Sequence, residues 1–259
     1  PHNAGAWGND IPLGDTSRTM GEYFRRGGYA TAYIGKWHLD GTDYFGTGIC
    51  PHGYDPEFWY DGRNYLEDLT PEERYLWRQG LKSSEDIRSH GITREWTWAG
   101  GITERAVEFI SRQSADTPYL LVASYDEPHS PSVCPPPFCD MYEEFRLPLP
   151  DNHYDDLADK PEHHLEWAKQ FDFEPEGLHQ PLYFGASTFV DDEIGRVVAA
   201  ADRFDRENTI VIFTTDHGHY LGAHHLREKG PCPYEEVTRV PLILRGNGIV
   251  SGERSDSLI

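Results

Sequence analysis

Apolar and polar positions along the chain follow two periods, one typical of helices and one typical of short strands. The two kinds of segment alternate, which is the pattern of an α/β protein. The helical pattern covers residues 20–26, 103–112 and 184–204, and the strand pattern covers residues 29–34, 119–124, 209–215 and 240–244. The run at 209–215 is almost uninterrupted, so we expect a parallel strand that is covered on both faces.

The predicted helices carry end signals and buried faces. Gly27 and Gly28 directly follow the first helix, at a position where glycine commonly ends one. Thr103 is placed to cap the second helix, because its hydroxyl can accept a hydrogen bond from a backbone N–H of the first turn. The third helix has a stripe of apolar residues that we expect to be buried, namely Phe189, Val190, Ile194, Val197 and Val198.

Two long stretches, 39–101 and 127–181, lack a regular pattern and are rich in Pro, Gly, Asp, Trp and Tyr. Loops of this length inside a compact α/β domain usually carry function, so we expect them to shape a substrate pocket. The chain has 259 residues and no internal repeat, which fits one large α/β domain. The simplest organisation is a single domain over residues 1–259.

The composition is strongly acidic. The formal net charge is −21 at pH 7, which argues against nucleic acid or an anionic membrane surface as the main partner. No apolar run approaches the ~20 residues that a membrane-spanning helix needs. An acidic protein that binds an anion must build a positive pocket from a few placed cations or from a metal, so individual lysines and histidines become informative.

Four cysteines, Cys50, Cys134, Cys139 and Cys232, are too few and too scattered for a disulfide framework. Cys134 and Cys139 flank a proline-rich loop, where they could pair or bind a metal. Reduced, unpaired cysteines are the simpler interpretation. The cysteines therefore do not indicate the cellular compartment of the protein.

Polar residues follow the predicted strands at the edge where α/β sheets place their ligands. Gly35, Lys36 and His38 come after the strand at 29–34. If the chain stays extended there, the side chains of Lys36 and His38 point to the same side. Such a pair suits an oxyanion, although a surface Lys beside a core-edge His is the simpler interpretation of this motif alone.

His129 follows the strand at 119–124, with Pro128 before it and Pro131 shortly after it. The two prolines restrict the backbone and hold the imidazole in place. The ring could donate a hydrogen bond to an anion or protonate a leaving group. A histidine in a turn without a chemical task explains the pattern equally well.

Asp216 and His217 follow the most hydrophobic strand, and a carboxylate beside an imidazole at a strand end suits a divalent metal. Further histidines downstream invite a zinc interpretation. Their spacing fits no common zinc signature, so we favour a hard cation with oxygen ligands. The residues concerned are His219, His224 and His225.

Lys229, followed by Gly230, is a second cation that could meet an anion near this metal, although a lone Lys in a loop is usually only solvated. Together the strand ends supply two lysines, several histidines and one aspartate. That is the positive pocket that an acidic, anion-hydrolysing protein needs.

Four blocks of the sequence are informative in combination. Residues 28–39 read GYATAYIGKWHL, residues 126–129 read DEPH, and residues 215–218 read TDHG, with a further block at 221–243. The first matches the second sulfatase signature, GYxTxxxGKWHL, throughout. The others are similar, in order and content, to the substrate histidine and to the metal and late-lysine block of the same family. The chain therefore resembles the sulfatase family of the alkaline phosphatase superfamily, and most of all its bacterial, choline-sulfatase-like members.

This resemblance implies an alkaline phosphatase-like α/β fold, with a central, mostly parallel mixed sheet sandwiched by helices. It implies a sulfatase that hydrolyses the ester of a small sulfated substrate. Asp216 and His217 would be metal ligands, for Ca²⁺ in the first place and for Mg²⁺ or Mn²⁺ as alternatives. The compartment would be the cytoplasm or the periplasm of a bacterium.

The resemblance also assigns catalytic roles. Lys36 and Lys229 would bind sulfate oxygens and offset the charge that develops on the leaving oxygen. His38 would hold a hydroxyl of the nucleophile. His129 would contact the substrate and assist the departure of the leaving group.

The family's nucleophile is a formylglycine made from Cys or Ser in the motif C/S-x-P-x-R. None of the four cysteines is followed by x-P-x-R, and the family's N-terminal Asp-Asp metal pair is absent too. We therefore expect a sulfatase-type catalytic domain that is truncated at both ends and inactive as it stands, with the formylglycine outside this chain.

Two alternatives stay open. One is a phosphonate monoester or phosphodiester hydrolase of the same superfamily, which also uses Asp-His at its metal. The other is a non-catalytic relative that binds sulfated ligands.

Overall fold

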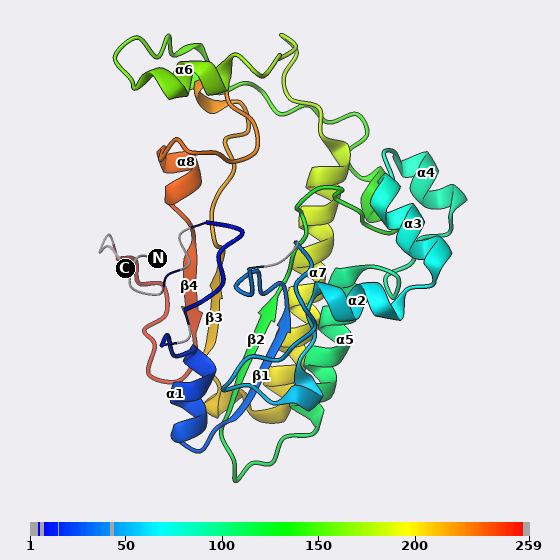
Figure 1. Cartoon of the computed structure of the whole chain (residues 1–259), viewed down its shortest axis with the longest axis vertical. Helices are drawn as coiled ribbons and strands as arrows, with labels where there is room; N and C mark the ends of the chain where they lie inside the picture. Colours follow the sequence, from blue (N-terminus) through cyan, green and yellow to red (C-terminus); the bar gives the residue numbers. More distant parts are fainter. Residues whose placement is uncertain (1–4, 6–7, 15, 42–43, 256–259) are drawn as a thin grey trace. The chain divides into compact units, whose positions relative to one another are not determined.

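The computed structural model of the chain describes residue 5 and residues 8–14, 16–41 and 44–255. The chain divides into two compact units (Figure 1). The first unit contains residues 1–143 and 181–205, and the second contains residues 144–180 and 206–259. The organisation as one domain over 1–259 stays a prediction. Among the helices in the described ranges, none is both long and apolar enough to cross a bilayer.

The first unit contains a parallel two-stranded sheet. β1 (Ala30–Gly35) pairs with β2 (Tyr119–Ser124), so that Gly35 lies opposite Ser124. Both strands lie where the sequence predicted them. Gly35 has a φ of +119°, and a Cβ there would lie only 1.9 Å from the carbonyl oxygen of Ser124, so only glycine fits. Because the strands are parallel, the segments that follow them emerge at the same edge of the sheet.

Three helices of the first unit test the sequence predictions. α1 (Met20–Arg26) begins and ends as predicted, with Gly27 at its C-cap. α7 (Pro181–Asp205) includes the predicted helix and buries Phe189 and Val190 from the expected stripe. α5 (Trp98–Ser111) begins earlier than predicted, because Thr97 rather than Thr103 accepts the capping hydrogen bond, from the N–H of Gly100.

The stretch at 39–101, which the sequence left irregular, contains several short helices. Each of the three α-helices begins after a residue whose side chain accepts a hydrogen bond from its first turn, namely Asp61, Thr70 and Ser83. These caps stabilise helices too short and too polar to show a clear period. The elements are η2 (Pro56–Phe58), α2 (Gly62–Asp68), α3 (Pro71–Gln79) and α4 (Ser84–Ser89); η3 (Phe138–Asp140) follows in the next loop.

The second unit contains an antiparallel pair, β3 (Val211–Thr214) and β4 (Leu242–Arg245), with Val211 opposite Arg245. The expectation of a parallel strand at 209–215, covered on both faces, is wrong. β3 is antiparallel to its partner β4, and Ile212 is 61% exposed. An apolar run shows that a strand can be buried, but it does not specify the direction of the neighbouring strand.

Short helical segments and loops make up the rest of the second unit. They are η4 (Asp151–Tyr154), α6 (Glu162–Ala168), η5 (Arg206–Asn208), η6 (Ala223–His225) and α8 (Glu235–Thr238). A small core gathers around Tyr220, Leu226 and Cys232. All four cysteines of the chain are free thiols, which confirms the simpler interpretation of their spacing.

Candidate functional site

Lys36 directly follows β1, and its backbone is tied to the end of β2. Its N–H donates to the carbonyl of Ser124 at 2.9 Å, and the Ser124 hydroxyl donates back to the Lys36 carbonyl at 2.9 Å. The Tyr33 hydroxyl donates to the same carbonyl at 2.6 Å. The position of Lys36 is therefore fixed by the sheet.

The side chain of Lys36 is held by two groups. Its Nζ donates to the hydroxyl of Tyr44 and to Oδ1 of Asp126, each at 2.8 Å. The Tyr44 hydroxyl also bonds to the Asp126 carboxylate, so the three groups form a closed network. The Lys36 side chain is 16% exposed and that of Asp126 only 4%.

His38 and His129 lie against the same tyrosine. Their ring centroids are 5.7 and 5.0 Å from that of Tyr44. The extended conformation considered for the residues after Gly35 is not found. His38 has a φ of +55°, which lies in the left-handed region. The structure nevertheless brings Lys36, His38 and His129 together around Tyr44.

The imidazole of His129 has a defined orientation. Its Nδ1 lies 3.0 Å from the carbonyl oxygen of Ser130, so the neutral ring carries its proton on Nδ1. Nε2 then has the lone pair and can exchange a proton with a bound molecule.

Glu127, between Asp126 and His129, was not singled out by its sequence position. Its Oε1 accepts a hydrogen bond from the N–H of Ala99 at 3.0 Å, and its Oε2 is buried with no hydrogen-bond partner among the described residues. Burial, and then the neighbouring charge of Asp126, raise the pKa of Glu127 to about 7. This carboxyl group is therefore partly protonated at neutral pH.

In the second unit, Asp216, His217 and Lys229 converge. Nε2 of His217 lies 3.5 Å from Oδ2 of Asp216 and accepts a hydrogen bond from Nζ of Lys229 at 3.0 Å. Nδ1 of His217 faces the carbonyl of Gly218 at 2.8 Å, which leaves the Nε2 lone pair directed at these two groups. A Cβ on Gly218 would lie 1.9 Å from the carbonyl oxygen of Glu236, so the close approach of these two backbone segments requires glycine at position 218.

Asp216 and His217 fit part of a divalent metal site. The carboxylate of Asp216 is 76% exposed, and the lone pair of His217 Nε2 is directed to the same region. One oxygen and one nitrogen ligand are fewer than the six to eight that Ca²⁺ takes, so these residues supply a fraction of the shell.

The remaining histidines of this segment have other contacts. Nδ1 of His219 accepts a hydrogen bond from the N–H of Leu221, and burial lowers the pKa of His219 to about 4, with a smaller effect of the charges of His217 and Lys229. His224 lies 2.9 Å from Asp155 and stacks on a tyrosine. His225 contacts the Phe171 carbonyl at 3.0 Å. In the described part of the chain, none of the three belongs to a group of at least three converging metal ligands.

Asp126 and Tyr44 were not predicted from the sequence as partners of Lys36. The signal for Asp126 was present, because it lies two residues after the end of β2, close to the point where Lys36 follows β1. Tyr44 gave no signal beyond being one aromatic residue in a long loop.

Comparisons with known proteins identify the family of the chain. The sulfatase family model matches residues 1–259. The chain is 50% identical over 248 residues to the uncharacterized sulfatase YidJ of Escherichia coli strain K12. This alignment covers 94% of the chain and 50% of YidJ. The chain thus spans about half the length of the curated relatives it matches.

Solved structures confirm the expected alkaline phosphatase-like α/β fold. The phosphonate monoester hydrolase of Agrobacterium radiobacter is 21% identical, with a TM-score of 0.69 over 92% of this chain and 54% of that one. A protein solved with its substrate D-glucosamine-2-N,6-O-disulfate is 19% identical, with a TM-score of 0.67 over 95% of this chain and 58% of that one. With the family model matching throughout and half of the aligned residues identical to YidJ, the chain belongs to the sulfatase family.

Proposed function

We propose that this protein is a sulfuric ester hydrolase acting on a small sulfate monoester. The observation that carries the proposal is the placement of Lys36, His38 and His129 around Tyr44, at the edge of the sheet where the chain leaves β1 and β2. Lys36 and the two imidazoles offer an ammonium and ring nitrogens that can donate hydrogen bonds to an anion, in a chain whose net charge is −21. Membership of the sulfatase family supports a sulfate ester as that anion.

In the first unit, Lys36 would bind a sulfate oxygen and offset charge on the leaving oxygen. The network with Tyr44 and Asp126 holds its ammonium in place, so little side-chain entropy is lost when an anion binds. In its imidazolium form His129 would donate the Nε2 proton to the leaving oxygen and keep its Nδ1 proton on the carbonyl of Ser130, which leaves the ring neutral. His38 would hold a hydroxyl of the nucleophile.

In the second unit, Asp216 and His217 would hold a divalent cation, with Ca²⁺ as the first choice and Mg²⁺ or Mn²⁺ as alternatives. When bound, such a cation polarises an ester oxygen as a Lewis acid. Lys229 would bind a sulfate oxygen. Its present contact with His217 shows that its ammonium reaches the candidate metal ligands.

The nucleophile would be a formylglycine, whose precursor motif C/S-x-P-x-R is not found at any of the four cysteines. Its attack on sulfur needs a group at the opposite side of the sulfur atom to stabilise the departing oxygen. His129 and Lys36 would supply that stabilisation.

The proposal is tested on the protein expressed at the full length of its gene. Sulfate monoesters, phosphate monoesters and phosphodiesters are assayed in parallel, and we expect the highest kcat/KM with a sulfate monoester. Lys36→Ala and His129→Ala should each lower kcat/KM by about 100-fold or more. Lys82→Ala, at an exposed lysine outside the candidate site, is the matched control. A clear preference for a phosphodiester, or no hydrolysis of any sulfate ester, would contradict the proposal.

A further inference from the structure

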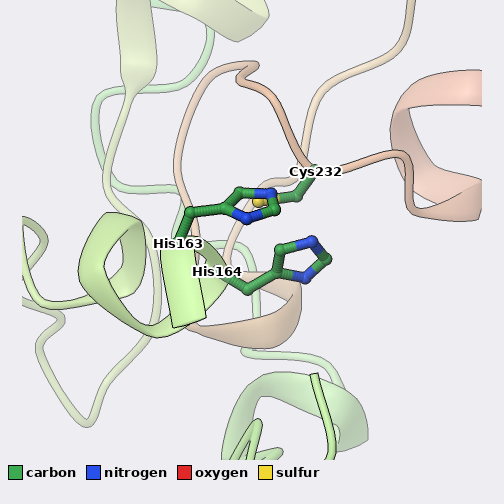
Figure 2. A group of neighbouring side chains, drawn as sticks. All are labelled: His163, His164 and Cys232. Carbon is green, nitrogen blue, oxygen red and sulfur yellow. The ribbon is translucent and has the colours of Figure 1, made fainter. Parts of the chain in front are cut away.

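Three potential metal ligands converge in the second unit, and none of them is Asp216 or His217. They are His163 and His164 in α6, and Cys232 in the loop before α8 (Figure 2). One nitrogen from each ring and the Cys232 sulfur all lie within 4.8 Å of one another. His164 is 6% exposed and Cys232 is fully buried, whereas His163 faces solvent.

The loop that carries Cys232 is held rigidly. The carbonyl of Cys232 accepts hydrogen bonds from the Tyr220 hydroxyl at 2.6 Å and from the N–H of Tyr234 at 2.9 Å. Gly230 lies so close to the ring of Trp167 in α6 that a Cβ would come within 2.6 Å of Nε1. The loop and the helix therefore already pack together before any ion binds.

The orientation of His164 is also defined. Its Nδ1 lies 2.8 Å from the hydroxyl of Tyr234, and the two rings meet edge to face at 5.2 Å. A hydrogen bond at Nδ1 leaves Nε2 as the nitrogen available to a metal. A ligating histidine whose second nitrogen is held by a polar partner is the usual arrangement in metal sites.

The donor set selects the kind of ion. Two imidazoles and one thiolate suit Zn²⁺, whereas Ca²⁺ and Mg²⁺ require oxygen ligands. Around a tetrahedral Zn²⁺ the bond lengths place ligand atoms about 3.3 to 3.8 Å apart. Separations within 4.8 Å therefore need side-chain movements of about 1 Å, and the exposed His163 can make the largest of them.

We propose that His163, His164 and Cys232 form a zinc site, with a water molecule as the fourth ligand on the side of the exposed His163. The site would join α6 to the loop that follows Lys229. Because only Gly230 and Pro231 separate Lys229 from Cys232, the ion would restrict the backbone that carries this lysine. This site is distinct from Asp216 and His217 and does not depend on the proposed function.

Zinc binding is measured on the 259-residue chain after treatment with a chelator. Titration with Zn²⁺ alone, against a chromophoric competitor, should show one tight site per chain. Co²⁺ in place of Zn²⁺ should give a sulfur-to-metal charge-transfer band, which reports a thiolate ligand directly. Zn²⁺ should also raise the Tm, since an ion that binds only the folded state stabilises it.

His163→Ala is the decisive variant, because an exposed side chain is removed and the fold is kept. It should weaken Zn²⁺ binding by about 100-fold, and Cys232→Ser should abolish the charge-transfer band of the Co²⁺ form. His90→Ala and Cys50→Ser are matched controls outside the cluster and should bind as the wild type does.

The double variant Asp216→Asn with His217→Ala separates the two metal sites. It should keep the tight zinc site and the charge-transfer band. The proposal would be overturned if the wild-type chain shows no tight zinc site, if His163→Ala binds as the wild type does, or if the Co²⁺ form lacks the band. Loss of the tight site in the double variant would also overturn it, because the zinc would then belong to Asp216 and His217.

Discussion

The ammonium of Lys36 lies 2.8 Å from Oδ1 of Asp126, and the Asp126 side chain is only 4% exposed. The two residues follow parallel strands that end opposite each other, so the ion pair is a direct consequence of the register of β1 and β2. The pair fixes the cation in place and also partly neutralises it. A sulfate that binds to Lys36 must therefore compete with a carboxylate that is already present.

Removal of Lys36 alone should destabilise the chain, because the buried carboxylate of Asp126 would lose its cation. We expect Lys36→Met to lower the free energy of unfolding by about 3 kcal/mol. The double variant Lys36→Met with Asp126→Asn should recover most of this loss, since no buried charge is left without a partner. Urea denaturation of the wild type and of each single and double variant gives the coupling energy. Additive effects would show that the ion pair has no part in stability.

Glu127 should make stability depend on pH. Its pKa is about 7 in the fold and 4.5 ordinarily, so the folded state holds a proton that the unfolded chain has released. The contribution of this group to stability is therefore complete below pH 4.5 and is lost as the pH rises through 7. The difference corresponds to about 3 kcal/mol.

Glu127→Gln keeps the shape and removes the titration. This variant should unfold at about the same urea concentration as the wild type at pH 4.5, and at a higher one at pH 8. The matched control is Glu85→Gln at an exposed helix position, which should leave the pH dependence unchanged. Parallel stability curves for the wild type and Glu127→Gln between pH 4.5 and pH 8 would contradict the assignment.

Much of the first unit could be predicted from the sequence. The sequence located α1 by the two glycines that follow it, β2 by its apolar run and α7 by an apolar stripe that includes the buried Phe189 and Val190. The start of α5 was missed since Thr97 and Thr103 are equally good caps in the sequence, and only the tertiary contacts choose between them. Thr103 is instead buried, with its hydroxyl 2.8 Å from that of Tyr125.

The candidate site residues were singled out because they lie shortly after a predicted strand. Lys36 and His129 follow β1 and β2, and segments that follow parallel strands emerge at one edge of the sheet. Asp216 was singled out in the same way after the run at 209–215, although β3 pairs antiparallel with β4. His163, His164 and Cys232 were not, since 67 residues separate the last two and no short motif marks them. Their convergence depends on the packing of α6 against a distant loop, which no local period reports.

Gly35 should tolerate no side chain, unlike a glycine in open space. A Cβ at Gly35 would lie 1.9 Å from the Ser124 carbonyl oxygen, and its φ of +119° is unfavourable for other residues. Gly35→Ala should lower the free energy of unfolding by more than about 2 kcal/mol. Gly195→Ala, in α7 with nothing within 4 Å of the added carbon, should raise it by about 0.5 to 1 kcal/mol. If thermal denaturation shows that both substitutions change the Tm in the same direction, the close approach of the two strands at Gly35 is contradicted.

Removal of divalent metal should abolish sulfatase activity in the full-length protein, and Ca²⁺ should restore it if Asp216 and His217 are ligands. The variant His217→Ala should then require about 10- to 100-fold more Ca²⁺ for half-maximal activity, because one ligand is lost while Asp216 remains.

Lys229→Met removes the ammonium that lies 3.0 Å from His217 Nε2, so it should bind Ca²⁺ at least as tightly as the wild type. It should still lose kcat/KM, because the role proposed for Lys229 is to bind a sulfate oxygen. Titration of activity with Ca²⁺ separates the two effects, with His90→Ala as the control at an exposed histidine. An unchanged Ca²⁺ requirement in His217→Ala would remove this residue from the metal shell.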